Sequence, residues 1–291
     1  MFDLIASMFS YTFILRALIV GLLVSLCSAL LGVSLVLKRY SMIGDGLSHV
    51  GFGALAVAMA MNWTPLAVAV PVVIIAAFLL LRVSENSAIK GDSAIALIST
   101  SSLALGIMVI SLSKGMNSDV YGYMFGSILA MSNADVLMSA ALSAVVLVLF
   151  IVCYHKIFAV TFDEDFAKAT GIRVGRYNML IALLTAITIV LGMRMMGALL
   201  ISALVIFPAL TSMRVCKRFH SVVLVSALIS VCCFFIGLTV SYLFAAPTGA
   251  SVVVVNIVCF LIFSLLPWTA LMILGTRWKA SPPQSVNVST P

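Results

Sequence analysis

The sequence predicts an all-α integral membrane protein, a polytopic helical bundle of about eight to nine transmembrane helices. Hydrophobic residues make up 64% of the 291-residue chain and charged residues only 9%, whereas about a quarter of the residues in soluble domains are charged. Apolar runs recur along the chain at lengths near the roughly 20 residues that a helix needs to cross the hydrocarbon core. Basic residues fall in alternate connections between these runs, a pattern that sets the orientation of a chain in a membrane.

Nine hydrophobic segments are expected to form helices. They cover residues 12–37, 41–61, 65–81, 93–113, 134–154, 177–193, 197–213, 219–244 and 251–274. With nine spans and a cytoplasmic C-terminus, most of the 16 basic residues fall on the cytoplasmic side, as the positive-inside rule requires. The N-terminus is therefore predicted to lie outside. Residues 10–275 form the predicted transmembrane domain, and the polar residues 276–291 are predicted to be a disordered cytoplasmic tail.

Composition and missing motifs argue against several classes of protein. The basic residues stand singly or in pairs between apolar runs, so we expect no clustered surface for nucleic acid. The six cysteines have no C-x-x-C spacing, which argues against a disulfide framework or a zinc-thiolate site. The sequence contains no G-x-x-x-x-G-K-[ST], H-E-x-x-H or G-x-S-x-G motif, so the chain is not expected to hydrolyse ATP or to be an enzyme.

Asp45 and His49 are the strongest candidate functional residues. They lie in the second hydrophobic segment, and residues at i and i+4 share one face of a helix. A charged aspartate costs roughly 2.5 to 3.5 kcal/mol in the middle of a membrane helix, so a function is the default explanation. A carboxylate and an imidazole together suit a divalent transition-metal ion, zinc above all. The alternative is a hydrogen bond between two helices of the bundle.

A second candidate region is the charged stretch at residues 161–176, on the predicted cytoplasmic side. Three acidic residues at 163–165, followed by Gly171, are typical of the two ends of a short surface helix. Phe162 and Phe166 would form an apolar stripe on that helix. Because its start is acidic, the helix is expected to dock into a protein partner rather than onto an anionic lipid surface.

Several motifs, in order along the chain, resemble those of the membrane permeases of ATP-binding-cassette importers for zinc, manganese and iron. The resemblance covers roughly residues 10 to 275. Its motifs are Gly44-Asp-Gly-Leu-Ser-His49, Gly91-Asp-Ser-Ala-Ile95 with Ala104-Leu-Gly-Ile107, Phe125-Gly-Ser-Ile-Leu129, the stretch 162–172, Gly197-Ala-Leu-Leu-Ile-Ser-Ala-Leu-Val-Ile-Phe-Pro208 and Pro247-Thr-Gly-Ala250.

The resemblance implies a dimeric permease in a bacterial plasma membrane. Two permeases would be joined by two cytoplasmic ATP-binding subunits, which supply ATP hydrolysis, and by an extracytoplasmic metal-binding protein. Asp45 and His49 of both protomers would form a transient four-ligand site at the dimer axis. The segment 161–176 would meet the ATPase, with coupling assigned to Asp163, Glu164, Ala167 and Gly171.

The expected cargo is a divalent transition-metal ion, with no permanently bound cofactor. Zinc is favoured because imidazole ligation suits it and because Thr161-Phe-Asp-Glu-Asp165 looks more like zinc permeases than manganese permeases. Manganese and ferrous iron stay open as alternatives. An ATPase-independent secondary transporter is less favoured because of the predicted docking helix, and a membrane enzyme would need a second catalytic group near Asp45 that the sequence does not supply.

Overall fold

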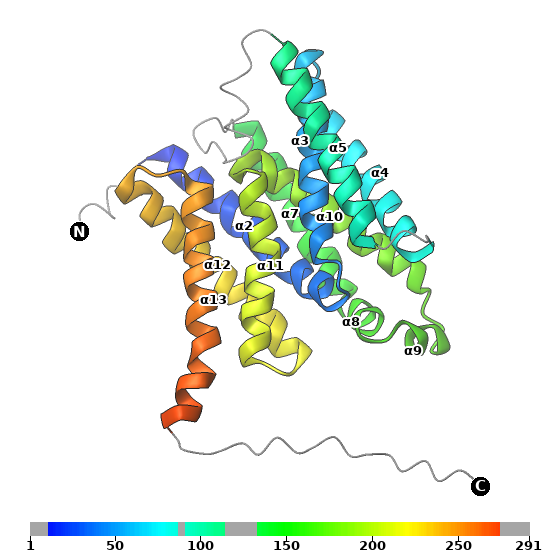
Figure 1. Cartoon of the computed structure of the whole chain (residues 1–291), viewed down its shortest axis with the longest axis vertical. Helices are drawn as coiled ribbons and strands as arrows, with labels where there is room; N and C mark the ends of the chain where they lie inside the picture. Colours follow the sequence, from blue (N-terminus) through cyan, green and yellow to red (C-terminus); the bar gives the residue numbers. More distant parts are fainter. Residues whose placement is uncertain (1–10, 87–90, 114–132, 274–291) are drawn as a thin grey trace.

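The chain is entirely helical in the part that can be described, which confirms the predicted fold class. The computed structural model describes residues 11–86, 91–113 and 133–273, and no β-strand occurs in these ranges (Figure 1). The helices are α2 (Thr12–Leu37), α3 (Ser41–Ala60), α4 (Pro65–Asn86), α5 (Gly91–Leu112), α7 (Asn133–Val152), α8 (Tyr154–Phe162), α9 (Glu164–Ala169), α10 (Val174–Met196), α11 (Ala198–Val215), α12 (Phe219–Phe244) and α13 (Thr248–Ile273).

Each of the nine predicted segments corresponds to a helix, but fewer than nine qualify as spans. Seven of the described helices are long and apolar enough to cross a membrane, and α7 with α8 would make an eighth if that bent pair is one span. The apolar part of α11, Leu200–Val215, is shorter than the others. The described helices therefore agree with the lower end of the predicted eight to nine spans. The predicted tail at 276–291 lies outside the described residues.

The bundle has a buried centre and more exposed flanks. In the most apolar stretch of α2, α3 and α10, 67%, 72% and 61% of the residues are buried. In the corresponding stretches of α4, α5 and α13, only 22% to 28% are buried. In Figure 1, α3, α4 and α5 form one side of the bundle and α12 and α13 the other, with α2, α10 and α11 between them. Side chains on the flanks therefore face lipid or other chains.

Glycine lets α3 and α5 approach closely. A Cβ atom added to Gly53 of α3 would lie 2.7 Å from the backbone oxygen of Ser102, and one added to Gly106 of α5 would lie 3.0 Å from the Cα atom of Gly53. Small residues at such crossings are the usual means by which membrane helices pack backbone to backbone. This contact fixes α3, the helix that carries Asp45 and His49, against its neighbour.

The turns rich in basic residues gather at one end of the bundle. An ion pair joins Lys38, at the end of α2, to Glu164 of α9. The rings of Tyr154 and Phe219 lie 5.7 Å apart, which brings the start of α8 beside the start of α12. A cavity lies between the end of α4 and the start of α10 and is lined by residues of both helices. This arrangement agrees with the charge asymmetry expected from the sequence.

We expect Gly53→Ala to lower the thermal unfolding midpoint, because the new methyl group would collide with the Ser102 backbone of α5. Overpacking costs about 1 to 3 kcal/mol, which corresponds to a fall of roughly 3 to 10 °C in Tm. Gly44→Ala is the matched control on the same helix, since its Cβ atom would find its nearest neighbour, Val205, at 3.7 Å. Equal Tm values for the two detergent-purified variants would contradict the role assigned to Gly53.

Candidate functional site

Asp45 and His49 lie together on one face of α3, as their spacing predicts. The Nε2 atom of His49 is 3.6 Å from the Oδ2 atom of Asp45, which is beyond ordinary hydrogen-bond length. Asp45 is the fifth residue of α3 and His49 the ninth. At about 1.5 Å per residue, the pair therefore lies about 6 and 12 Å along a helix of roughly 30 Å.

The pair belongs to the one uncovered stripe of an otherwise buried helix segment. The side chains of Asp45 and His49 are 42% and 24% exposed, and Met42, one turn before Asp45, is also exposed. By contrast, the residues between them, Gly46, Leu47 and Ser48, are buried. Contacts with α4, α5, α10 and α11 cover the remaining sides of α3. The carboxylate and the imidazole are therefore only partly covered by the neighbouring helices that the structure describes.

One chain provides only two metal-binding side chains at this position. Within the described ranges, no group of three or more His, Cys, Asp or Glu side chains is close enough to hold a metal ion. A structural or catalytic zinc ion normally has three or four protein ligands. The pair can contribute half of such a coordination shell, and its open side leaves room for donors from another molecule.

The second candidate region contains the short surface helix that the sequence predicts, α9, and a further short helix, α8, comes directly before it. α8 ends at Phe162, and α9 starts at Glu164 after the extended residue Asp163. The carboxylate of Asp163 accepts hydrogen bonds from the backbone N–H groups of Asp165 and Phe166, which is a standard helix N-cap. The sequence did not predict α8 as a separate helix, and α7 and α8 bend by 69° relative to each other at Cys153.

The other residues assigned to coupling have defined places in this region. Ala167 is fully buried in a small cluster with Val160 and Val174. Gly171 has a φ of +83° just after α9, a left-handed conformation that favours glycine. Phe162 and Phe166 are 60% and 64% exposed. Asp163, Ala167 and Gly171 therefore shape the segment. The predicted stripe on one helix is wrong, because Phe162 ends α8 and Phe166 lies in α9, although both side chains are exposed.

Glu164 points back into the bundle. The Nζ atom of Lys38 lies 2.6 Å from the Oε1 atom of Glu164 and 2.6 Å from the Oδ1 atom of Asn178. The side-chain amide of Asn178 in turn donates to Glu164 at 3.2 Å. The Lys38 side chain is only 6% exposed, whereas that of Glu164 is 40% exposed. This triad, Lys38–Glu164–Asn178, ties α9 to the end of α2 and to α10.

The charge state of Glu164 follows from the triad. Burial raises the pKa of the carboxyl, but hydrogen bonds from Lys38 and Asn178 and the positive charge of Lys38 outweigh burial and hold the pKa below its usual value. A depressed pKa means that this contribution to stability is present above the ordinary glutamate pKa and is lost as the pH falls through the folded-state value. The Glu164 carboxyl is therefore ionised at neutral pH and can accept the hydrogen bonds from Lys38 and Asn178.

Lys38 also connects the triad to the candidate metal ligands. It is the C-cap residue of α2, and α3 begins three residues later, after Arg39 with a φ of 61° and Tyr40. The backbone N–H of Tyr40 donates to the Leu35 carbonyl at 2.8 Å, which makes the turn tight. A displacement of α9 would thus reach the start of α3 through one short, hydrogen-bonded turn. No sequence spacing marked Lys38 or Asn178 as partners of Glu164.

Comparisons with known proteins agree with this geometry. A sequence model of the ABC 3 transport family matches residues 10–266. The chain is 28% identical over 260 residues to the manganese import system permease protein ScaB of Streptococcus gordonii, with 89% of this chain and 93% of ScaB covered. It is 28% identical over 246 residues to the high-affinity zinc uptake system membrane protein ZnuB of Haemophilus influenzae, with 84% of this chain and 94% of ZnuB covered.

A solved structure extends the likeness to the fold. The structure of PsaBC from Streptococcus pneumoniae in complex with Fab matches with a TM-score of 0.83 and 28% sequence identity, and the match covers 94% of this chain and 99% of that chain. The family match spans almost all of the described helices and includes both candidate regions. The chain therefore belongs to the ABC 3 transport family, as a membrane-spanning permease.

Proposed function

We propose that this permease imports divalent transition-metal ions, zinc foremost, with energy from a separate ATPase. The observation that carries the proposal is the position of Asp45 and His49 on the uncovered stripe of α3. A carboxylate and an imidazole in a membrane segment need a polar partner, and a passing cation provides one. The ion is cargo, so the site binds it transiently.

The ligand types of the pair support zinc, which accepts both an imidazole nitrogen and a carboxylate oxygen. Imidazole is also a better ligand for zinc than for manganese. Manganese is the second candidate, because the relative ScaB is named for it and is as similar to this chain as ZnuB.

A second protomer would complete the site. Two-fold symmetry places the same surface of both subunits against each other, so one pair per chain becomes four ligands at the axis. The exposure of Asp45 and His49 and the lack of a third ligand within the described ranges both support this arrangement. The dimer would then switch between a state open to the outside and a state open to the cytoplasm. The ion would bind the same four donors in both states.

The ATPase would dock at the two short helices. Phe162 and Phe166 are exposed apolar anchors of the kind that a groove in a partner protein accepts. This assignment places α9 and the basic turns in the cytoplasm, with the N-terminus outside and the C-terminus inside, in a bacterial plasma membrane. An extracytoplasmic metal-binding protein would deliver the ion at the opposite end. A secondary transporter would not require such a docking surface.

Replacing both ligands, Asp45→Ala with His49→Ala, should abolish metal uptake and leave the protein in the membrane. The two side chains are exposed and 3.6 Å apart, so their loss removes ion ligands without opening a cavity in the core. The measurement is uptake of radioactive zinc into cells that produce equal amounts of each variant. Met42→Ala, on the same stripe, is the control and should transport normally. Uptake by the double variant at the wild-type rate would remove the pair from the ion path.

The nature of the cargo is tested by growth in chelated medium. A strain that lacks the permease and its relatives is complemented with the wild-type gene, and each metal is restored separately. Zinc should rescue growth at a lower concentration than manganese or iron, because one imidazole per protomer favours zinc in the usual affinity order. If manganese rescued growth at a lower concentration than zinc, the cargo would be manganese. The proposal that the chain belongs to an ATP-driven metal importer would still hold.

Breaking the triad should uncouple ATP hydrolysis from transport. Lys38→Met leaves the Glu164 carboxylate without the cation 2.6 Å away, so movement of α9 would no longer reach α3 through the α2–α3 turn. We expect uptake per ATP hydrolysed to fall about tenfold in proteoliposomes with the complete transporter, which is the size of a modest coupling free energy.

Two further variants separate a loss of coupling from a loss of folding. Lys38→Arg keeps the cation and should retain most of the transport. The exchanged pair, Lys38→Glu with Glu164→Lys, should recover part of the coupling that either single change loses, which is the signature of a direct interaction. Wild-type uptake per ATP in the Lys38→Met transporter would show that the triad is only a structural tether.

A further inference from the structure

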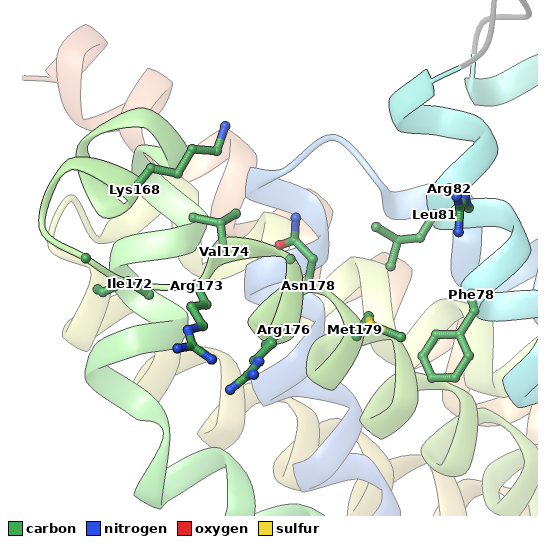
Figure 2. Close-up of a pocket in the computed structure, with 12 residues that line it drawn as sticks. Phe78, Leu81, Arg82, Lys168, Ile172, Arg173, Val174, Arg176, Asn178 and Met179 are labelled. Carbon is green, nitrogen blue, oxygen red and sulfur yellow. The ribbon is translucent and has the colours of Figure 1, made fainter.

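A large cavity of mixed character lies between α4 and α10, away from the candidate metal ligands. Its volume is about 860 Å³, within the range of small-molecule sites. In Figure 2, α4 contributes Phe78 and Arg82 on one side, and α10 contributes Arg176 and Met179 on the other. Neither Asp45 nor His49 lines it, so it is a site distinct from the proposed ion path.

The cavity lies where two apolar spans end. The apolar part of α4 extends to Val83, and that of α10 begins at Val174. Phe78 and Met179 therefore lie on the hydrocarbon side of this boundary, whereas the loop after α9 lies on the aqueous side. Met179 is 53% exposed, so the apolar wall is accessible from outside the bundle. A ligand in this cavity would meet both an apolar and a polar environment.

The polar side of the cavity is strongly cationic. Its described lining contains four basic residues and no acidic one: Arg82, Lys168, Arg173 and Arg176. Of these, Lys168 is paired with Asp165, at 3.2 Å and at an exposed position. The side chains of Arg173 and Arg176 extend in the same direction in Figure 2, as expected for the fork-like groups that bind one anionic oxygen cluster from two sides.

We propose that this cavity binds an anionic phospholipid of the leaflet at this end of the bundle. The phosphate would lie against Arg173 and Arg176, and an acyl chain would run along Phe78 and Met179. Basic pockets between membrane helices are a recognised form of headgroup site. The proposal depends on the membrane location of the chain and not on the cargo.

A lipid fits the cavity better than a protein partner does. A water-soluble ATPase would reach the arginines but not the apolar wall beside Met179, which lies within the span of α10. A second copy of the chain would bring the same four basic residues and add to the positive charge. A free phosphate would use the arginines alone and leave the apolar wall exposed. Only an amphipathic anion satisfies both sides of the cavity.

The test is native mass spectrometry of the delipidated, full-length permease titrated with phosphatidylglycerol or phosphatidylcholine. The wild-type protein should retain phosphatidylglycerol at least about tenfold better than phosphatidylcholine. Arg173→Gln with Arg176→Gln should remove this preference, because two cations close to the phosphate are lost. Lys217→Gln with Arg218→Gln is the matched control, since it removes two exposed charges from the α11–α12 turn outside the cavity, and should keep the preference.

A filling variant tests the cavity without changing its charge. A Cβ atom added to Gly175 meets nothing within 4 Å, and Gly175 lines the cavity, so Gly175→Trp should fold and should lower phosphatidylglycerol retention about tenfold. Soluble glycerol 1-phosphate at the same concentration should not displace the lipid, which separates a lipid from a free phosphate. The proposal would be overturned if Arg173→Gln with Arg176→Gln and Gly175→Trp both kept the preference for phosphatidylglycerol. It would also be overturned if the control, Lys217→Gln with Arg218→Gln, lost the preference to the same extent.

A photo-crosslinking residue in place of Met179 identifies the occupant in cells. Attachment to a phospholipid supports the proposal. Attachment to the ATPase or to a second permease, with no lipid adduct, would overturn it and assign the cavity to a protein interface. Since Met179 is exposed, the substitution should not disturb the packing of α10.

Discussion

The architecture depends on one constraint: a carboxylate and an imidazole must remain accessible on a helix that is packed on its other sides. Glycine meets this constraint, because Gly53 and Gly106 let α3 and α5 approach until their backbones touch. Close packing on those sides holds α3 rigidly and leaves the stripe with Asp45 and His49 as its open surface. The proposed ion path would need no cavity inside one chain, since it would form where two chains meet.

The Lys38–Glu164–Asn178 triad gives the permease a physical connection between its two candidate regions. Of the four residues assigned to coupling from the sequence, Asp163 and Gly171 set the ends of α9 and Ala167 packs its inner face. Glu164 holds that helix to the turn before α3. A movement of α9 would then reach α3 through the short, hydrogen-bonded turn between α2 and α3. It would not need a long chain of packed side chains.

Much of the fold was predictable because a helix needs about 20 mostly apolar residues to cross a membrane, and such runs are visible in the sequence. The nine apolar segments locate nine helices, and the i, i+4 spacing of Asp45 and His49 correctly predicts a shared face. The predicted segment 134–154 ends at the break after Cys153, but no local pattern predicted that a separate helix, α8, follows it. The triad was missed for another reason: Lys38 and Glu164 are 126 residues apart, and no local pattern encodes a contact between such distant residues. Seven or eight of the described helices are long and apolar enough to cross a membrane, which agrees with the lower end of the predicted eight to nine.

The burial of Lys38 has a consequence for biosynthesis. The ribosome adds Glu164 126 residues after Lys38, and therefore long after α2 and α3 have left the exit tunnel. Until then the ammonium group must extend to the headgroup region, as lysines near helix ends do. The N-terminal hairpin consequently enters the membrane in a looser form and closes only when α9 and α10 arrive. The final position of the helix that carries the ion ligands is thus set late, by a carboxylate from the second half of the chain.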